Sequence, residues 1–260
     1  MSPLSTASEE ALAIFIARDD QHGVADASAM MGMEAAILGD YPAAHTAIEN
    51  SVAIGRMLGD RPLIAHRLRD LGLVRACERD FVGARAAWQE SLAIALTLGD
   101  GQHSAVAMVL LRLGILDRLE GDYVRARDQI DQALALLDNV DTTRGDRPFL
   151  ARRALGSLAL AQGHLEEARA VFREQLRRRD TTPLLGFASC LCHLGIVASA
   201  EGAHARAARL IAAGSPTGPP ANAHEPDTRI DAEDALIRAR AALGEVAFES
   251  ACEAGRAMTL

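Results

Sequence analysis

Lysine is absent from this sequence of 260 residues, because all 27 of its Lys and Arg residues are arginines. A chain without lysine cannot form a lysine Schiff base, and it lacks the lysine of the usual phosphate-binding loop. Two large classes of enzyme are thereby excluded. The formal net charge of -8 opposes nonspecific contact with phosphate backbones or anionic lipids, so we expect neither nucleic acid nor a membrane as a direct partner.

Cysteine is scarce as well, and the four cysteines match neither a disulfide framework nor the spacing of a zinc finger. No apolar run reaches the roughly 18 residues of a membrane span, and the first residues lack the basic segment of a secretory signal. Patterns of phosphate loops, GxSxG elbows, HExxH helices and calcium loops are also missing. We therefore expect a cytoplasmic protein without a metal or cofactor.

Aromatic residues make up only 3% of the chain, and β-branched residues are few. Alanine, leucine and arginine are abundant instead, and these residues lose little free energy on entering a helix. The composition therefore predicts an all-α fold with almost no strand.

A Gly-Asp-aromatic turn, clearest in Gly39-Asp40-Tyr41, recurs along the chain. The first positions of its copies are spaced by 40, 42, 42 and 39 residues: Gly39, Arg79, Gly121, Gly163 and Gly202. An alanine lies five residues after each of these positions. Seven residues before each position lies a glycine: Gly32, Gly72, Gly114, Gly156 and Gly195. Nine residues after each position lies a large apolar residue: Ile48, Trp88, Ile130, Phe172 and Ile211. Small and large residues at helical spacing predict five closely packed two-helix hairpins, which must stack because one hairpin cannot cover its apolar face.

The Leu-Gly, Gly-Asp-Tyr, Ala and Phe/Trp elements resemble the tetratricopeptide repeat (TPR) over roughly residues 24–213. This resemblance implies an α-α superhelix, a TPR-like solenoid of about five helical hairpins with capping helices at both ends. The repeats depart from the family because they lack its first-helix Trp and Tyr and its terminal Pro. Their interval also exceeds the usual length of about 34 residues.

The final run ARAALGEVAFESACEAGRAMTL and the Leu-Gly-Asp endings of the second helices resemble a more specific group. They are similar to the C-terminal sensor arrays of large bacterial LuxR-type ATP-dependent transcriptional activators. That resemblance implies a part in transcription regulation, in which a bound molecule shifts how the array packs on a partner.

Four segments are expected along the chain. They are a flexible tail at 1–7, the TPR-like solenoid at 8–213, a Pro/Gly-rich loop at 214–228 and a helical cap at 229–260 that packs on the solenoid. The run ALAIFIARDD near the start aligns with the end of a later second helix, so the chain opens with a second helix that lacks its first and exposes an apolar flank. That flank is a native cap, a joint to a longer protein or a dimer interface. We interpret His224 and the acidic run Asp227 to Asp234 as a solvated linker and helix start.

In TPR arrays the first helix of each pair lines the concave face, and the resemblance therefore implies which residues face a groove. Spacing from each glycine gives Asp26, Met30, Met33, Ile37, His66, Arg69, Asp70, Leu73, Cys77, Met108, Leu111, Arg112, Ile115, Arg118, Leu150, Arg153, Ser157, Leu160, Ser189, Cys192, His193 and Ile196. The candidate ligand-binding residues among them are Met30, Met33, His66, Arg69, Asp70, Leu73, Met108, Leu111, Arg112, Ile115, Arg153, Ser157 and His193.

Two sets of these residues suggest what the groove binds. Arg69, Arg112 and Arg153 lie at matching levels of successive helices, where guanidinium groups can clasp a carboxylate or phosphate; the alternative is ordinary ion pairing between helices. An adaptable apolar surface is offered by Met30, Met33 and Met108, unless they are simply core residues.

Two further groups could carry chemistry. His66 and Asp70 share a helix face, so the carboxylate can orient the imidazole as a base; the alternative, which the spacing favours, is a structural pair. Cys190, Cys192 and His193 resemble metal ligands, but residues two apart on a helix point about 200 degrees away from each other. We expect no metal site.

The sequence thus favours a non-catalytic binding module of regulatory or scaffold type. Its expected partner is a protein or peptide, including a helix, or a small amphiphilic or anionic molecule, and a homodimer remains open. The alternative is an enzyme whose groove forms a reaction pocket, with His66 and Asp70 as acid-base groups and arginines stabilising negative charge.

Overall fold

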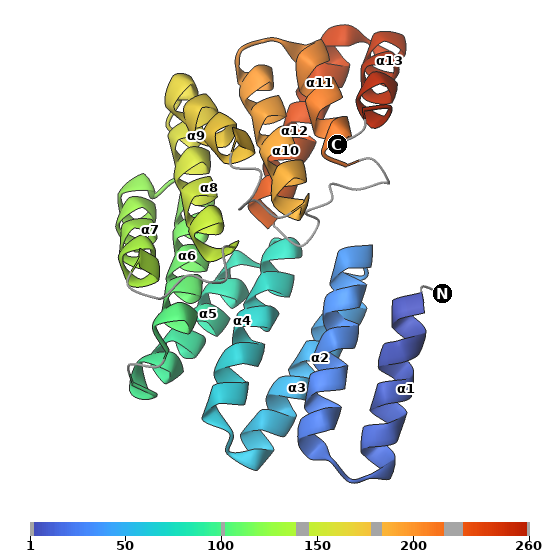
Figure 1. Ribbon diagram of the computed structural model, residues 1–260, viewed down its shortest axis with the longest axis vertical. Helices are drawn as coiled ribbons and strands as arrows, with labels where there is room; N and C mark the ends of the chain where they lie inside the picture. The colour runs from blue at the N-terminus through green and yellow to red at the C-terminus, as the bar shows by residue number, and fades with distance from the viewer. Residues whose placement is uncertain (1–2, 100–101, 139–145, 178–183, 216–225, 259–260) are drawn as a thin grey trace. The chain divides into compact units, whose positions relative to one another are not determined.

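The computed structural model describes residues 3–99, 102–138, 146–177, 184–215 and 226–258 of the chain. These residues form thirteen helices and no strand. The helices are α1 (Pro3–Ala17), α2 (Gln21–Leu38), α3 (Tyr41–Leu58), α4 (Arg61–Cys77), α5 (Phe81–Thr97), α6 (His103–Leu119), α7 (Tyr123–Asp138), α8 (Asp146–Ala161), α9 (Leu165–Arg177), α10 (Leu184–Ala200), α11 (His204–Ala213), α12 (Pro226–Leu243) and α13 (Glu245–Arg256) (Figure 1).

The chain divides into two compact units, Met1–Val109 and Leu110–Leu260, with the boundary inside α6. In the N-terminal unit α1 packs on α2, and α2 to α5 pack each on the next helix along the chain. In the C-terminal unit α7 to α11 do the same, and α12 packs on both α10 and α11 while α13 packs on α11. Sequential packing of antiparallel helices is the arrangement that repeat proteins use.

The recurring Gly-Asp turns end one helix and begin the next. Gly39 adopts a left-handed φ of 83° at the end of α2, and its side-chain-free backbone tolerates that conformation. The following Asp40 accepts a hydrogen bond from the Ala43 amide at 3.1 Å and so caps α3. Arg79 takes the glycine position in the next copy with a φ of 63°. The turn predicted from the sequence is therefore confirmed.

The glycines seven residues before each turn allow the two helices of a hairpin to approach closely. A Cβ on Gly32 would lie 2.7 Å from Cγ1 of Ile48, and one on Gly72 would overlap the indole of Trp88. The Trp88 indole N–H also donates to the Arg69 carbonyl at 3.0 Å. The same pairing recurs in the remaining hairpins, between Gly114 and Ile130, Gly156 and Phe172, and Gly195 and Ile211.

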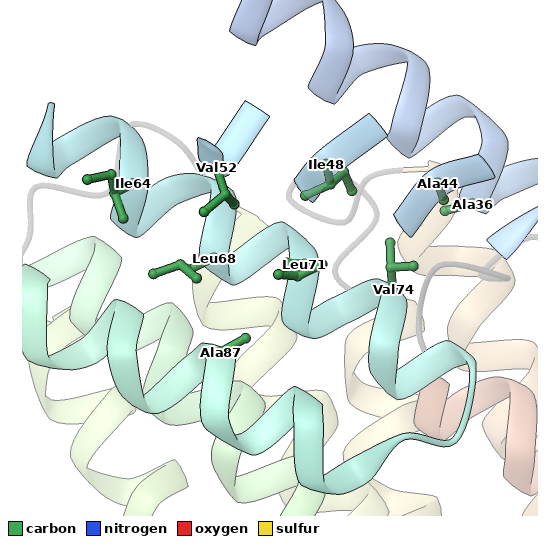
Figure 2. Packing of buried hydrophobic residues seen from close by; sticks show 9 residues of the cluster. All are labelled: Ala36, Ala44, Ile48, Val52, Ile64, Leu68, Leu71, Val74 and Ala87. Carbon is green, nitrogen blue, oxygen red and sulfur yellow. The ribbon is translucent and has the colours of Figure 1, made fainter. Parts of the chain in front are cut away.

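A second contact recurs in the hairpins α2–α3 and α4–α5, where it joins the second helix to the first. The buried hydroxyls of Ser51 and Ser91 donate at 2.7 Å to the carbonyls of Ala25 and Ala65, which lie 26 residues earlier in both cases. The apolar core of the N-terminal unit gathers residues from α2 to α5, as Figure 2 shows: Ala36, Ala44, Ile48, Val52, Ile64, Leu68, Leu71, Val74 and Ala87. The predicted all-α, TPR-like helical repeat is confirmed.

Candidate functional site

The first helices α2 and α4 form one face of the N-terminal unit, which we call the α2–α4 face. Met30 and Ile37 lie on α2 with 59% and 53% of their surface exposed, so both apolar side chains are open to a ligand. Met33, between them, is partly buried and packs against the core of the unit. The two candidate methionines on α2 thus differ, because Met30 is accessible and Met33 is largely a core residue.

Charged side chains connect α2 and α4 beside these apolar residues. The guanidinium of Arg67 on α4 pairs with Asp26 of α2 and lies 3.4 Å from a carboxylate oxygen of Asp70. Arg69 approaches the other oxygen of Asp70 to 3.5 Å. The α2–α4 face therefore combines exposed apolar groups with a partly solvated network of acidic and basic groups.

His66 and Asp70 also lie on this face, with Nε2 and Oδ2 separated by 3.8 Å. Burial is the main cause that lowers the pKa of His66, with Arg69 and Arg67 acting in the same direction against the opposing effect of Asp70. Because Asp70 is shared with both arginines, its carboxylate is not dedicated to orienting the imidazole. This geometry gives the proposed acid-base pair no specific support.

Several other candidate groove residues lie inside the helix packing. Leu73, Leu111 and Ile115 are buried apolar residues with 8%, 1% and 2% exposure. Arg112 is 9% exposed, whereas Met108 is half-buried. The three buried apolar residues stabilise the repeat and present little surface to a ligand.

The polar candidate residues of α8 and α10 are enclosed in the C-terminal unit: Arg153, Ser157 and His193. Arg153 is only 1% exposed, and its Nη1 donates to Thr228 Oγ1 at 2.6 Å and lies 3.4 and 3.5 Å from the two carboxylate oxygens of Asp227. Asp227 and Thr228, in the first turn of α12, are themselves completely buried. Arg153 therefore binds a carboxylate, as the sequence suggested for the arginines, but the carboxylate belongs to the same chain.

A second arginine, Arg118 at the end of α6, completes this cluster. Its Nη2 lies 2.9 Å from Oδ2 of Asp231 and 3.9 Å from Oδ2 of Asp227. Burial raises the pKa of Asp231, and the charge of Asp227 acts in the same direction, whereas Arg118 opposes both. We call Arg118, Arg153, Asp227, Thr228 and Asp231 the α12 cluster; its two arginines balance its two aspartates.

His193 on α10 borders the α12 cluster. Its ring stacks on Phe172 with centroids 4.6 Å apart, and its Nδ1 lies 2.8 Å from the Ser189 carbonyl. A carbonyl only accepts, so Nδ1 carries the proton and Nε2 is left as an acceptor. Complete burial is the main cause that lowers the pKa of His193 to about 4, with Arg153 contributing in the same direction. The ring is therefore a neutral, structural part of this site.

Apolar contacts continue the interface between α12 and the helices beneath it. Ala232 and Ala235 of α12 pack with Ile196 of α10 and Ile211 of α11 in one buried cluster. Figure 1 shows α12 running beside α10 and α11. The interpretation of the acidic run as solvated is wrong for Asp227 and Thr228, because both are buried. Arg153, 74 residues earlier in the chain, pairs with Asp227 and donates a hydrogen bond to Thr228. His224 lies outside the described residues.

The cysteines do not form a ligand set. Cys190 and Cys192 are buried thiols, and burial raises their pKa values to about 12 and about 11. Within the described ranges, no group of three or more His, Cys, Asp or Glu side chains is placed to hold a metal ion. None of the described helices has both the length and the apolarity that crossing a membrane requires.

Comparison with known proteins places the fold but names no family. No protein-family model matches the sequence, and no curated protein matches it. Among solved structures, BtubC (BKLC) from P. vanneervenii is similar, with a TM-score of 0.59 and 15% identity over 96% of this chain and 89% of BtubC. The PilF protein of Pseudomonas aeruginosa matches with a TM-score of 0.50 and 18% identity over 90% of this chain and 97% of that one. At such identities the likeness establishes the helical-repeat fold alone.

Proposed function

We propose that this protein is a non-catalytic interaction module that binds an amphipathic helix of a partner protein on its first-helix faces. The observation that carries the proposal is the seating of α12 against α10, with its first turn held by Arg153 of α8. The surface that α10 and α11 form thus already accommodates a helix through buried apolar contacts, and arginine–aspartate pairs hold the start of that helix. Helix-in-groove binding uses this combination.

The α2–α4 face is the surface that we assign to the partner. Met30 and Ile37 provide apolar anchors seven residues apart, which places them on one side of α2. Asp26, Arg67 and Asp70 beside them supply charges that orient a bound helix. Methionine adapts to differently shaped apolar partners, which suits a module with several ligands.

The regulatory setting is the finer part of this proposal. It rests on the resemblance of the final residues to the sensor arrays of LuxR-type transcriptional activators. In such a setting, occupancy of the α2–α4 face changes how the chain packs on a partner. A small amphiphilic or anionic molecule at the same residues remains the competing ligand class.

The test is a selection of helical peptides on the intact protein. A displayed library of amphipathic helices is panned against the full chain, and the dissociation constant of the best peptide is measured by fluorescence anisotropy. Replacing both Met30 and Ile37 by Glu is expected to weaken binding about tenfold or more, because buried apolar anchors carry most of the affinity.

The matched control is Met57→Glu on α3, where the side chain is 67% exposed. This variant adds the same kind of charge away from the α2–α4 face and should bind with unchanged affinity. Failure to select any saturable binder, or equal affinity for the Met30→Glu,Ile37→Glu variant, would overturn the proposal.

A further inference from the structure

We infer that a groove between α3 and α5 is a second binding site, whose ligand is a small zwitterion with an ammonium and a carboxylate about 10 Å apart, as in a tripeptide with free ends. We call it the α3–α5 groove; it lies in the N-terminal unit and is lined by side chains of α3, α4 and α5. The inference goes beyond the proposed function, because no residue assigned to the α2–α4 face lines this groove and its ligand is not a helix.

The size of the groove is the first argument. Its volume is about 530 Å³, and small-molecule sites usually have roughly 300–1,000 Å³. Val52 of α3 and Leu68 and Leu71 of α4, which Figure 2 shows, close its inner side and are themselves buried in the core. The groove is therefore large enough for a small molecule, but little of the surface it offers is apolar.

Two ion pairs lie toward the two ends of the groove. Arg56 of α3 donates from Nη2 to both carboxylate oxygens of Glu90 of α5, at 2.8 and 3.1 Å. Arg75 of α4 donates to Glu49 of α3 at 3.2 Å and to the Gly83 carbonyl at 3.3 Å. Glu49 and Arg56 are seven residues apart, which separates the two pairs by about 10 Å along α3. Because the two arginines balance the two glutamates, the groove favours a ligand that carries both charges.

The repeat itself does not require these four charges. Counted from the recurring turns, the matching positions one repeat later hold Gln89, Leu96, Asp117 and Gln132. The charges in the groove also contribute little to stability, since three of the four side chains are about half exposed and such ion pairs are weak. A ligand can therefore replace either pair at small cost.

Exposure determines which charge of the ligand binds at which end. Arg75 is only 24% exposed, so a carboxylate bound there interacts in the least solvated part of the charge set. Glu49, when displaced, keeps its contact with Nε2 of His45 at 3.0 Å. The ammonium then binds Glu90, and Arg56, which is 55% exposed, returns to water.

The middle of the groove suits a slim polar chain. Ala53 of α3 and Ala86 of α5 are exposed, and their small side chains leave the space between the helices open. Asn50 is exposed on the same side of α3, and its amide can donate to and accept from the peptide groups of a ligand. A tripeptide with small side chains therefore fits both the ends and the middle.

The experiment titrates the full chain, labelled for amide NMR, with trialanine. We expect saturable shifts of amides in α3 and α5. Trialanine amide lacks the carboxylate and N-acetyl-trialanine lacks the ammonium, so each should bind about tenfold or more weakly, because each loses a charge-assisted contact. ω-Aminooctanoic acid has the same charged ends without peptide groups: weaker binding than trialanine identifies a peptide ligand, and tighter binding identifies an aliphatic amino acid.

Two variants connect the binding to the groove. Glu90→Gln, at an exposed position, should weaken trialanine about tenfold and leave the affinity for N-acetyl-trialanine unchanged, since that peptide has no ammonium. Arg75→Gln should bind trialanine and its amide equally. Glu10→Gln on α1, which removes an exposed carboxylate away from the groove, is the matched control and should bind like the unchanged chain.

Three results would overturn the inference. They are the absence of saturable shifts with trialanine, equal affinity of the unchanged chain for the three peptides, and equal affinity of trialanine for Glu90→Gln and the unchanged chain. Because Glu90→Gln changes only an exposed side chain, this last comparison remains decisive if Arg75→Gln does not fold.

Discussion

The first-helix faces of the two units differ in what covers them. In the N-terminal unit Met30 remains 59% exposed, and Asp26, which pairs with Arg67, keeps 61% of its side chain exposed. In the C-terminal unit Arg153 and Asp227 form an ion pair from which water is excluded. The same two-helix repeat therefore supports either a solvated face or a buried polar interface, and the difference is whether a helix lies on it.

The largest expected effect is on the buried pair. Arg153→Met would leave Asp227 buried without its nearest cation, at a cost of about 3–5 kcal/mol in the free energy of unfolding. Hydrogen exchange followed peptide by peptide should show a loss of amide protection in α8, α10 and α12, whereas the protection of α2 to α5 should stay unchanged. A loss below about 1 kcal/mol would mean that the first turn of α12 is solvated after all.

A smaller effect is expected from pH, again only in the C-terminal unit. Folding lowers the pKa of His193 from 6.5 to about 4. The contribution of the neutral ring to the free energy of unfolding is therefore complete above pH 6.5 and is lost as the pH falls toward 4. At pH 5 the loss is about 2 kcal/mol relative to pH 8. Besides burial, Arg153 and Arg118 lower this pKa and Asp227 opposes them.

The control for this prediction is His193→Gln, which has no titrating ring. Denaturant unfolding of the unchanged chain and of His193→Gln at pH 5 and pH 8 isolates the contribution of the histidine to the pH dependence of stability, because the carboxylates titrate equally in both chains. An equal pH dependence in the two chains would contradict the assigned pKa shift.

Local features of the fold were predictable from the sequence. Gly39 and Asp40 identified a helix end and the next helix start, because the left-handed conformation and the capping carboxylate need those residue types. Gly72 and Trp88 identified a close helix contact because their spacing is constant from repeat to repeat. These signals lie within a few helical turns of each other, and the repeats multiply them.

The α12 cluster was not predictable in the same way. Asp227 and Arg153 are 74 residues apart, and no repeat places a second copy of the pair elsewhere in the sequence. An acidic run after a Pro/Gly-rich segment has the composition of a solvated helix start, although four of its residues, Asp227 and Thr228 among them, are buried. The missing signal is the location of the neutralising arginines, which only tertiary packing provides.

The smallest expected effect concerns the N-terminal counterpart of the buried pair. Arg67→Met should cost about 1 kcal/mol or less, because Asp26 stays hydrated and Asp70 keeps Arg69 at 3.5 Å. The measurement is denaturant unfolding beside Arg153→Met under identical conditions. If the two variants lose equal stability, the α2–α4 network is as desolvated as the α12 cluster, and a ligand helix would gain nothing from its charges. A clear difference means that Asp26, with 61% of its side chain exposed, can exchange its water for a partner helix.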